Sequence, residues 1–294
     1  MTRTEFQEDA KNFVEAQLAV WPEAKERYLA LGKTERRRVA MGRVAGAVQF
    51  NPARSRSTTA DVSKAALEKR PCFLCAENRP AVQVALPILE GWTMLLNPFP
   101  IFPIHFTIVS DKHRDQLPDL ETLVRLAEKM PGMAVFFNGA KAGASAPDHQ
   151  HFQAVCVEEL PLLMEVERAF PADKSAVYEV RRDTSLPESE RWPFAFRTAV
   201  ICLDAEGMAR LAEMNKPAHT ELINQYAWIG ERGELRLLEI PRKAHRPACY
   251  TASDDPLLIS PGAIDMAGIL IAVRPQDFER APERIPEILN DVAY

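Results

Sequence analysis

The amino-acid sequence predicts an α+β protein in which an antiparallel sheet is flanked by helices. Strand-length runs rich in β-branched and aromatic residues alternate with amphipathic helical stretches, and two of the runs, 223–230 and 235–240, are joined by a tight turn. The runs come in pairs and hairpins rather than in regular β-α-β units, which favours antiparallel pairing. The sequence has no short-period repeat, so any duplication of halves would be structural.

Each expected element rests on its own local pattern. Helices are expected over residues 5–31, 35–45, 62–69, 118–130 and 274–292. Strands are expected over residues 81–86, 92–97, 105–110, 133–138, 149–157, 196–203, 223–230 and 235–240. A loop of small residues, 138–148, leads directly into the strand at 149–157.

Composition excludes several classes of protein. The 294 residues are 47% hydrophobic and 26% charged, as in a globular protein, and the net charge is −5. This acidic balance gives no field for wrapping nucleic acid, so no nucleic-acid partner is expected and an anionic substrate would need a local basic cluster. No run approaches the roughly 20 apolar residues that a bilayer span needs, so no membrane association is expected.

The five cysteines indicate a reducing compartment. Their number is odd, and the first residues mix both charge signs without the apolar core of a secretory signal. Three of them, Cys156, Cys202 and Cys249, lie in apolar runs where buried thiols are common. We therefore expect a cytoplasmic protein without a disulfide framework.

The segment His149-Gln150-His151-Phe152-Gln153 is the strongest chemical signal. Alternation along a strand would place His149, His151 and Gln153 on one face. A neutral imidazole is a good nucleophile toward phosphorus, and an amide can donate to a phosphate oxygen. Two histidines alternating by chance would explain an isolated motif, but the small-residue loop before it and the glutamine after it favour a functional site.

Cys72 and Cys75 have the spacing of a zinc knuckle. A tetrahedral site needs two more ligands, and the candidates in this half of the chain are His105, His113 and His149. A redox pair or a chance pair remains an alternative. The redox alternative fits poorly, because no helix that would lower the thiol pKa follows the motif.

Four segments in the same order resemble the histidine-triad superfamily. They are NPARSR at 51–56, CFLCAENRP at 72–80, VSDKHRDQLPDL at 109–120 and GASAPDHQHFQ at 143–153. Together they resemble galactose-1-phosphate uridylyltransferases, and the last segment is more similar to diadenosine tetraphosphate phosphorylases and GDP-L-galactose phosphorylases. SPGAIDMAGIL at 260–270 is also similar to the phosphorylases. The resemblance implies a histidine-triad-like fold of two similar halves, 1–170 with the zinc knuckle and 171–294 packed against it as one unit.

The resemblance also implies residue roles. His151 matches the nucleophile and Gln153 the glutamine that contacts phosphate. A structural zinc would be held by Cys72, Cys75, His113 and His149. Substrate-binding positions would be Arg54, Arg56, Asn97, Asn138, Gly139, Gly143 and Ser145. Arg54 and Arg56 could equally coat a solvated loop.

The implied reaction is nucleotidyl transfer in two displacements. The donor would be a nucleoside diphosphate sugar or a dinucleoside polyphosphate, and the acceptor phosphate or a sugar phosphate. Hydrolytic relatives carry a third histidine where this chain has Gln153, and an amide cannot shuttle protons, so anionic leaving groups and acceptors are expected. The alternatives are a dinucleoside polyphosphate hydrolase and a non-catalytic nucleotide-binding module. The sequence leaves open whether the protein forms a homodimer.

Two departures from the uridylyltransferase pattern favour a phosphorylase-like protein. Asp148 stands between Pro147 and His149, where that pattern has none, and the second half lacks a second histidine pair. His105 is expected only to pack within its strand. The basic run from Arg242 to Arg246 would either receive an anionic acceptor or lie in a solvated turn, and the second is the simpler expectation.

Overall fold

The computed structural model describes residues 1–202, 207, 209, 211–212 and 221–294, and these form the expected α+β fold. Nine strands make one large sheet in which every neighbouring pair is antiparallel. In sheet order they are β3 (Ala85–Leu89), β4 (Trp92–Leu96), β5 (His105–Ser110), β7 (His151–Cys156), β6 (Met133–Asn138), β10 (Ile223–Ile229), β11 (Leu235–Pro241), β9 (Phe196–Ile201) and β8 (Ala176–Val180).

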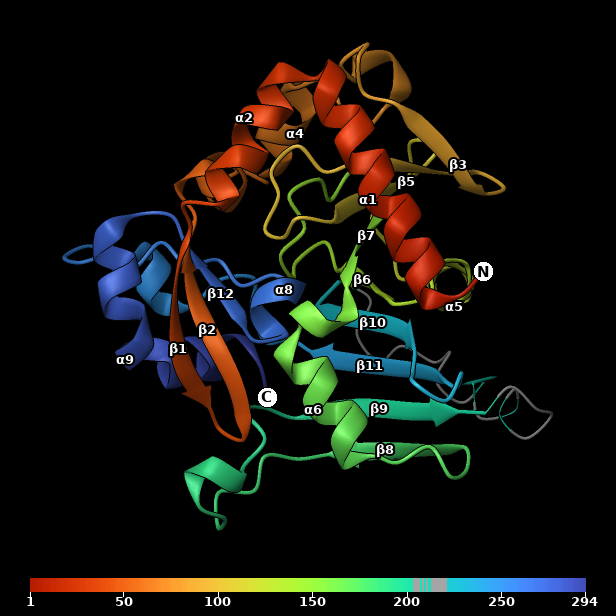
Figure 1. Ribbon diagram of the computed structural model, residues 1–294. Helices are drawn as coiled ribbons and strands as arrows, with labels where there is room; N and C mark the ends of the chain where they lie inside the picture. The colour runs from red at the N-terminus through yellow and green to blue at the C-terminus, as the bar shows by residue number, and fades with distance from the viewer. Residues whose placement is uncertain (203–206, 208, 210, 213–220) are drawn as a thin grey trace.

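A smaller sheet lies beside the large one (Figure 1). It contains the hairpin of β1 (Glu35–Met41) and β2 (Val44–Phe50), with β12 (Ile269–Ala272) parallel to β2. The helix expected at 35–45 was therefore wrong. Gly42, with φ 62°, forms the turn, and β2 is buried between β1 and β12, so long-range packing overrides the helical propensity of the arginine-rich run.

Helices cover both faces of the large sheet. On one face, α1 (Arg3–Val20), α2 (Pro22–Leu31) and α5 (Leu120–Lys129) bury their apolar sides against strand residues such as Phe106 and Phe152. On the other face lie the small sheet, α6 (Pro161–Ala169), α8 (Ala263–Met266) and α9 (Pro275–Val292), which enclose Phe136, Tyr226 and Trp228. The remaining short helices are α3 (Ser55–Thr58), α4 (Lys64–Lys69) and the 3₁₀ turns η1 (Pro52–Arg54), η2 (Ala76–Asn78), η3 (Val157–Glu159), η4 (Glu188–Glu190) and η5 (Ala248–Thr251).

Local sequence signals explain most of these boundaries. The side chain of Thr2 and that of Glu5 cap α1 reciprocally, and Pro22 begins α2 and so divides the stretch expected at 5–31. By contrast, β8, β12 and α6 were not expected, because each is short and is stabilised by packing on distant segments. The expected strand at 196–203 ends at Ile201, and Leu203 lies outside the described residues.

The two parts of the chain share one sheet. Residues Asn138 to Val135 of β6 pair with Asn224 to Ala227 of β10, and β12 joins the sheet begun by β1 and β2. The boundary between halves at residue 170 stays a prediction. The described part of the chain contains no helix that is both long and apolar enough to cross a membrane.

Candidate active site

Strand β7 presents His151 and Gln153 on the same face of the large sheet. Gln153 pairs with Thr107 on β5 and with Phe136 on β6. Two residues further along the same register, Asn138 would lie opposite His151, but the pairing of β6 with β7 ends at Phe136 and Gln153. The amide of Gln116 fills the gap, accepting from the His151 N–H at 2.8 Å and donating to the carbonyl oxygens of Asn138 and His151. This side chain therefore fixes the start of β7.

The ring of His151 has a defined tautomer. Its Nδ1 lies 2.7 Å from the carbonyl oxygen of His149, which can only accept, so Nδ1 carries the hydrogen and Nε2 carries the lone pair. The residue is 4% exposed. Burial lowers the pKa of His151 to about 4, which keeps the imidazole neutral near pH 7.

The amide of Gln153 has a defined orientation, and His105 is the cause. The backbone N–H of Ile101 donates to Nδ1 of His105 at 3.2 Å, so the hydrogen of the neutral ring is on Nε2. Nε2 donates to Oε1 of Gln153 at 2.8 Å. Burial, with Arg54 nearby, lowers the pKa of His105 to about 3. Because Oε1 is occupied in this way, the NH₂ of Gln153 is left for a ligand.

His105 is thus a functional candidate that the sequence did not reveal. It was expected only to pack within its strand, and it is indeed fully buried on β5. The position that it shares with Gln153 depends on the pairing of β5 with β7, across 48 residues of sequence. No local pattern carries that information.

The two cysteines and two histidines predicted as zinc ligands form one cluster. One ligand atom from each of Cys72, Cys75, His113 and His149 lies within 4.8 Å of the others. The Cys72 sulfur is 3.3 Å from Nδ1 of His149, and the Cys75 sulfur is 3.2 Å from Nδ1 of His113. Around a tetrahedral zinc, sulfur and nitrogen ligands are about 3.6 Å apart, so the cluster could hold such an ion.

The surroundings of the cluster also suit a metal. Nε2 of His149 donates to the carbonyl oxygen of Ser110 at 2.8 Å, which leaves Nδ1 to face the sulfurs. His149 precedes β7, which begins at His151, so the expectation that both share a strand was wrong. His105 lies with Gln153 and not in the cluster. Asp148 pairs with Arg70 at 2.9 Å, which ties the loop to the knuckle.

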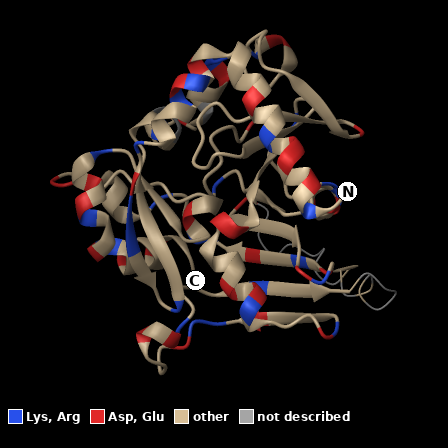
Figure 2. Ribbon diagram, in the orientation of Figure 1, with Lys and Arg blue, Asp and Glu red and all other residues tan. Residues whose placement is uncertain are grey.

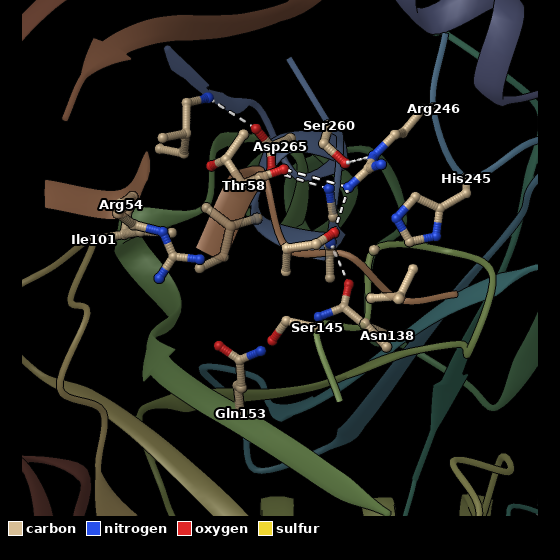
Figure 3. Close-up of a pocket in the computed structure, with 18 of the residues that line it drawn as sticks. Arg54, Thr58, Ile101, Asn138, Ser145, Gln153, His245, Arg246, Ser260 and Asp265 are labelled. Atoms are coloured by element: carbon tan, nitrogen blue, oxygen red, sulfur yellow. Dashed lines mark hydrogen bonds between the residues drawn. The ribbon is translucent and has the colours of Figure 1, made fainter. Parts of the chain in front are cut away.

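A cavity opens at Gln153 between the two layers (Figure 3). Its lining includes Asn138, Gly143, Ser145 and Gln153 and, from other segments, Arg54, Thr58, His245, Arg246, Ser260 and Asp265. Oδ1 of Asn138 accepts from the Ala263 N–H at 2.7 Å and from Asn224 at 3.1 Å. The NH₂ group of Asn138 therefore points away from those donors and, like that of Gln153, is left for a ligand. Figure 3 shows this NH₂ group beside Ser145.

The predicted nucleophile and several predicted substrate-binding residues do not line this cavity. His151 and Asn97 are not among the residues that line the cavity; Asn97 donates to Thr107 at 3.1 Å at the end of β4. A Cβ on Gly139 would lie 2.5 Å from the carbonyl oxygen of Glu221, so this glycine is required by packing. Arg56 lies in α3, and its side chain is outside the described part of the structure.

The residues of the basic run after β11 lie in three different environments. Arg242 is fully buried and donates to Oδ1 of Asn224 and to the carbonyl oxygens of Val292 and Pro261. Lys243 is exposed and contacts the last helix. His245 and Arg246 line the cavity. The expectation of a solvated turn therefore holds for Lys243 and was wrong for the rest.

The nine-stranded antiparallel sheet with helices on both faces is also found in solved structures of a nucleotide phosphorylase. The structure of yeast Ap4A phosphorylase Apa2 in complex with Ap4A matches with a TM-score of 0.59 and 14% identity, covering 97% of each chain. Another structure of the same yeast enzyme gives a TM-score of 0.56, also at 14% identity, and covers 93% of this chain and 96% of that one. The resemblance predicted from the four segments is confirmed at the level of fold.

Sequence comparison adds one match. Residues 13–156 match the family model of a domain of unknown function, DUF4922. That range contains the cysteine pair, the histidine segment and His105, and excludes His245 and Arg246. No curated protein sequence matches this chain.

Proposed function

We infer that this protein transfers a nucleoside monophosphate group through a covalent adduct on His151. One observation carries the inference: the hydrogen of the neutral imidazole is held by the His149 carbonyl, so Nε2 offers a lone pair on the face that carries Gln153. A buried neutral imidazole of this tautomer is ready to attack phosphorus without first losing a proton. The fold shared with a yeast Ap4A phosphorylase supports the same chemistry.

The substrate class follows from the amide donors. The NH₂ groups of Gln153 and Asn138 and the loop at Gly143 and Ser145 offer hydrogen bonds to non-bridging phosphate oxygens. The donor would be a nucleoside diphosphate sugar or a dinucleoside polyphosphate. In the first step the Nε2–P bond forms as the bond from phosphorus to the leaving oxygen breaks, and the electron pair leaves with an anionic phosphate.

No proton has to move in either step. Nδ1 keeps its hydrogen throughout, bonded to the His149 carbonyl, and the adduct is released when an acceptor oxygen displaces Nε2. An amide such as Gln153 suffices for this reaction, because it stabilises charge without exchanging protons. Phosphate or a sugar phosphate is already ionised and so fits as the acceptor.

The proposed zinc would have a structural role. Cys72, Cys75, His113 and His149 would hold one zinc, whose four ligand positions would then be filled, so that its contribution would be to fix the loop that leads into β7. His149 links the two sites, because its side chain belongs to the cluster and its carbonyl holds His151.

Labelling with a donor tests the proposal. The protein is mixed with nucleoside diphosphate sugars or dinucleoside polyphosphates without acceptor, and we expect a mass increase of one nucleoside monophosphate per chain, mapping to His151. The adduct should be labile in acid and stable in alkali, as a phosphoramidate is. His151→Gly should abolish it, and Gln153→Ala should slow its formation by about 10²–10³-fold.

Two results would contradict this proposal. If His151→Gly forms the adduct as fast as the parent, the nucleophile is another group. If no donor labels the parent while nucleotides bind, the protein is a binding module. Rapid release of the monophosphate by water alone would instead favour the hydrolase.

A further inference from the structure

Several residues that line the cavity come from segments distant in sequence from Gln153. Arg54 and Thr58 come from η1 and α3, His245 and Arg246 follow β11, and Ser260 precedes α8. Figure 3 shows His245 and Arg246 across the cavity from Asn138, Ser145 and Gln153. The cavity thus has polar donors on two opposite sides.

The guanidinium of Arg246 is held in place by the protein through two of its nitrogens, while its Nη1 is available to a ligand. Its Nε donates to Ser260 Oγ at 3.1 Å and its Nη2 to the Ala60 carbonyl oxygen at 3.0 Å, while its guanidinium lies 4.2 Å from the ring centre of Tyr250. Within the described residues, its Nη1 makes no hydrogen bond. A guanidinium fixed in this way loses little entropy when it binds an anion.

His245 also faces the cavity without a partner. Neither of its ring nitrogens forms a hydrogen bond with the described residues, although its backbone carbonyl accepts from Arg242. Burial, together with Arg246 and Arg242, lowers the pKa of His245 to about 4, so the ring is neutral and offers one N–H. A half-buried ring that lines a cavity and bonds to no described residue can complete its hydrogen bonds with a ligand.

The charge and size of the cavity favour one small anion. Arg54 and Arg246 are cationic, and the carboxylate of Asp265 has both oxygens occupied by the backbone N–H groups of Gly262 and Ile271. The local balance is thus one net positive charge. The cavity volume is about 60 Å³, a few times what a single water requires, which suits a phosphoryl group.

We propose that His245 and Arg246 form the subsite for the phosphoryl group of the acceptor, opposite Gln153. The assignment rests on the proposed function. In an in-line displacement at phosphorus, the leaving group departs opposite His151, and the acceptor of the second step enters from that same side. One subsite therefore serves both the departing phosphate and the incoming one.

In the second step an oxygen of the bound phosphate attacks the phosphorus of the adduct. The O–P bond forms, the P–Nε2 bond breaks, and its electron pair returns to Nε2 of His151. The product is a nucleoside diphosphate, and no proton is transferred. Arg246 and His245 hold the other oxygens of the acceptor, and water, which needs no such anchor, does not depend on them.

The test uses adduct formed beforehand on each protein by long incubation with donor and then freed of donor. Release is followed with inorganic phosphate, with glucose 1-phosphate and with water alone. We expect Arg246→Gln and His245→Gln to raise the phosphate concentration for half-maximal release by about 10- to 100-fold, with release by water unchanged. Lys243→Gln is the matched control, since it removes one exposed cation from the same turn and should leave all rates unchanged.

The two acceptor arms identify the source of the phosphoryl group. Faster release by inorganic phosphate than by glucose 1-phosphate is expected from the small cavity, and the reverse would assign the subsite to a sugar phosphate. Because the ring of His245 bonds to no described residue, His245→Gln should fold normally even if Arg246→Gln is destabilised.

Different results would contradict the proposed function and the acceptor subsite. An absence of adduct on the parent overturns the proposed function and the acceptor assignment with it. If the parent forms the adduct and phosphate releases it equally well from the parent, Arg246→Gln and His245→Gln, the nucleotidyl transfer stands and the subsite is refuted.

Discussion

At the scale of single residues, the orientation of one amide decides what the site can bind. Gln153 could present either its oxygen or its NH₂ to a ligand. The backbone N–H of Ile101 fixes the tautomer of His105, and His105 in turn holds the oxygen of Gln153. A backbone donor therefore determines, through two side chains, that the site offers a hydrogen-bond donor to phosphate.

His105→Asn tests this relay. Asparagine keeps an acceptor for the Ile101 N–H and loses the Nε2 donor. We expect adduct formation to slow by about tenfold, less than for Gln153→Ala, because the amide of Gln153 can then turn either way. In the double variant with Gln153→Ala, the substitution at His105 should have no further effect on the rate. An equal additional loss in both backgrounds would mean that His105 acts on packing alone.

Among the elements, the divergence of β6 from β7 makes room for the site. The pairing stops at Phe136 and Gln153, and Gln116 satisfies the strand ends beyond that point. The chain between the two strands can therefore form the loop that contains Gly143 and Ser145. Gly143 has φ 96°, and a Cβ there would lie 2.4 Å from the Cα of Gly262, so this loop packs tightly on the segment before α8.

Gln116→Ala should weaken the start of β7. It leaves the buried N–H of His151 without an acceptor, which costs about 1–3 kcal/mol of unfolding free energy. Urea unfolding measures the loss, and the labelling rate should fall with it because His151 is less well placed. The control is Gln7→Ala on α1, where the amide reaches only the Gly132 carbonyl and Glu158. If Gln116→Ala had the same stability and labelling rate as the parent, the hydrogen bonds of Gln116 would not be needed to hold the start of β7.

The loop glycine gives a second test at this scale. Gly143→Val should weaken nucleotide binding by separating the loop from Gly262, in addition to blocking close approach of a phosphate to the backbone. Calorimetry of nucleotide binding measures the effect, and unchanged affinity would mean that the loop only connects strands.

The metal cluster also acts on an element, the loop that ends at β7. We expect one zinc per chain by elemental analysis, and Cys72→Ser should lose the metal and lower the thermal unfolding temperature. His151→Gly is the control and should retain the metal, since its side chain is not a ligand. Parent protein without stoichiometric zinc, or Cys72→Ser with unchanged stability, would contradict the assignment.

Over the whole molecule, charge is dispersed while neutral histidines are buried. Figure 2 shows acidic and basic residues interspersed along α1 and α9, in keeping with the net charge of −5. Attraction of an anion therefore depends on the local arginines of the cavity. Burial holds the pKa values of His105 and His245 at about 3 and about 4, below the ordinary value of about 6.5.

Acid should therefore destabilise the fold. Between pH 6.5 and 4 the unfolded chain binds protons at these histidines and the folded protein does not, so the free energy of unfolding falls as the pH falls. Asp265 acts in the opposite sense, because burial raises its pKa to about 6 and the folded state takes up its proton first. Replacing His105 by Asn removes one of the destabilising protonations and leaves Asp265 and the metal ligands in place.

His105→Asn should accordingly lose about 2 kcal/mol less than the parent between pH 7 and pH 5. Urea unfolding at the two pH values, with the same variant compared at both, gives the measurement. Equal losses in the two proteins would mean that His105 takes up its proton over the same pH range in the folded and unfolded states, and the relay to Gln153 would then need another explanation.

The α+β class, most strands of the large sheet, the four metal-ligand candidates and the pair His151 and Gln153 could be predicted from the amino-acid sequence. These features depend on contiguous patterns: alternation within a strand, the spacing of two cysteines, and a histidine segment with a recognisable resemblance. The cysteine pair and the histidine segment are each contiguous in sequence, so local order is sufficient to find them, whereas His113 was implied by the resemblance.

The remaining features depend on contacts between segments that are far apart in the sequence. The run at 35–45 forms a strand and a turn instead of a helix because β12, more than 200 residues away, pairs with β2. His105 and Gln116 have no local pattern, and the basic run indicated His245 and Arg246 only as one of two alternatives. Each of the four takes its role from a partner or a cavity formed by another part of the chain. Burial and hydrogen bonding assign those roles, and both depend on which distant segments the fold brings into contact.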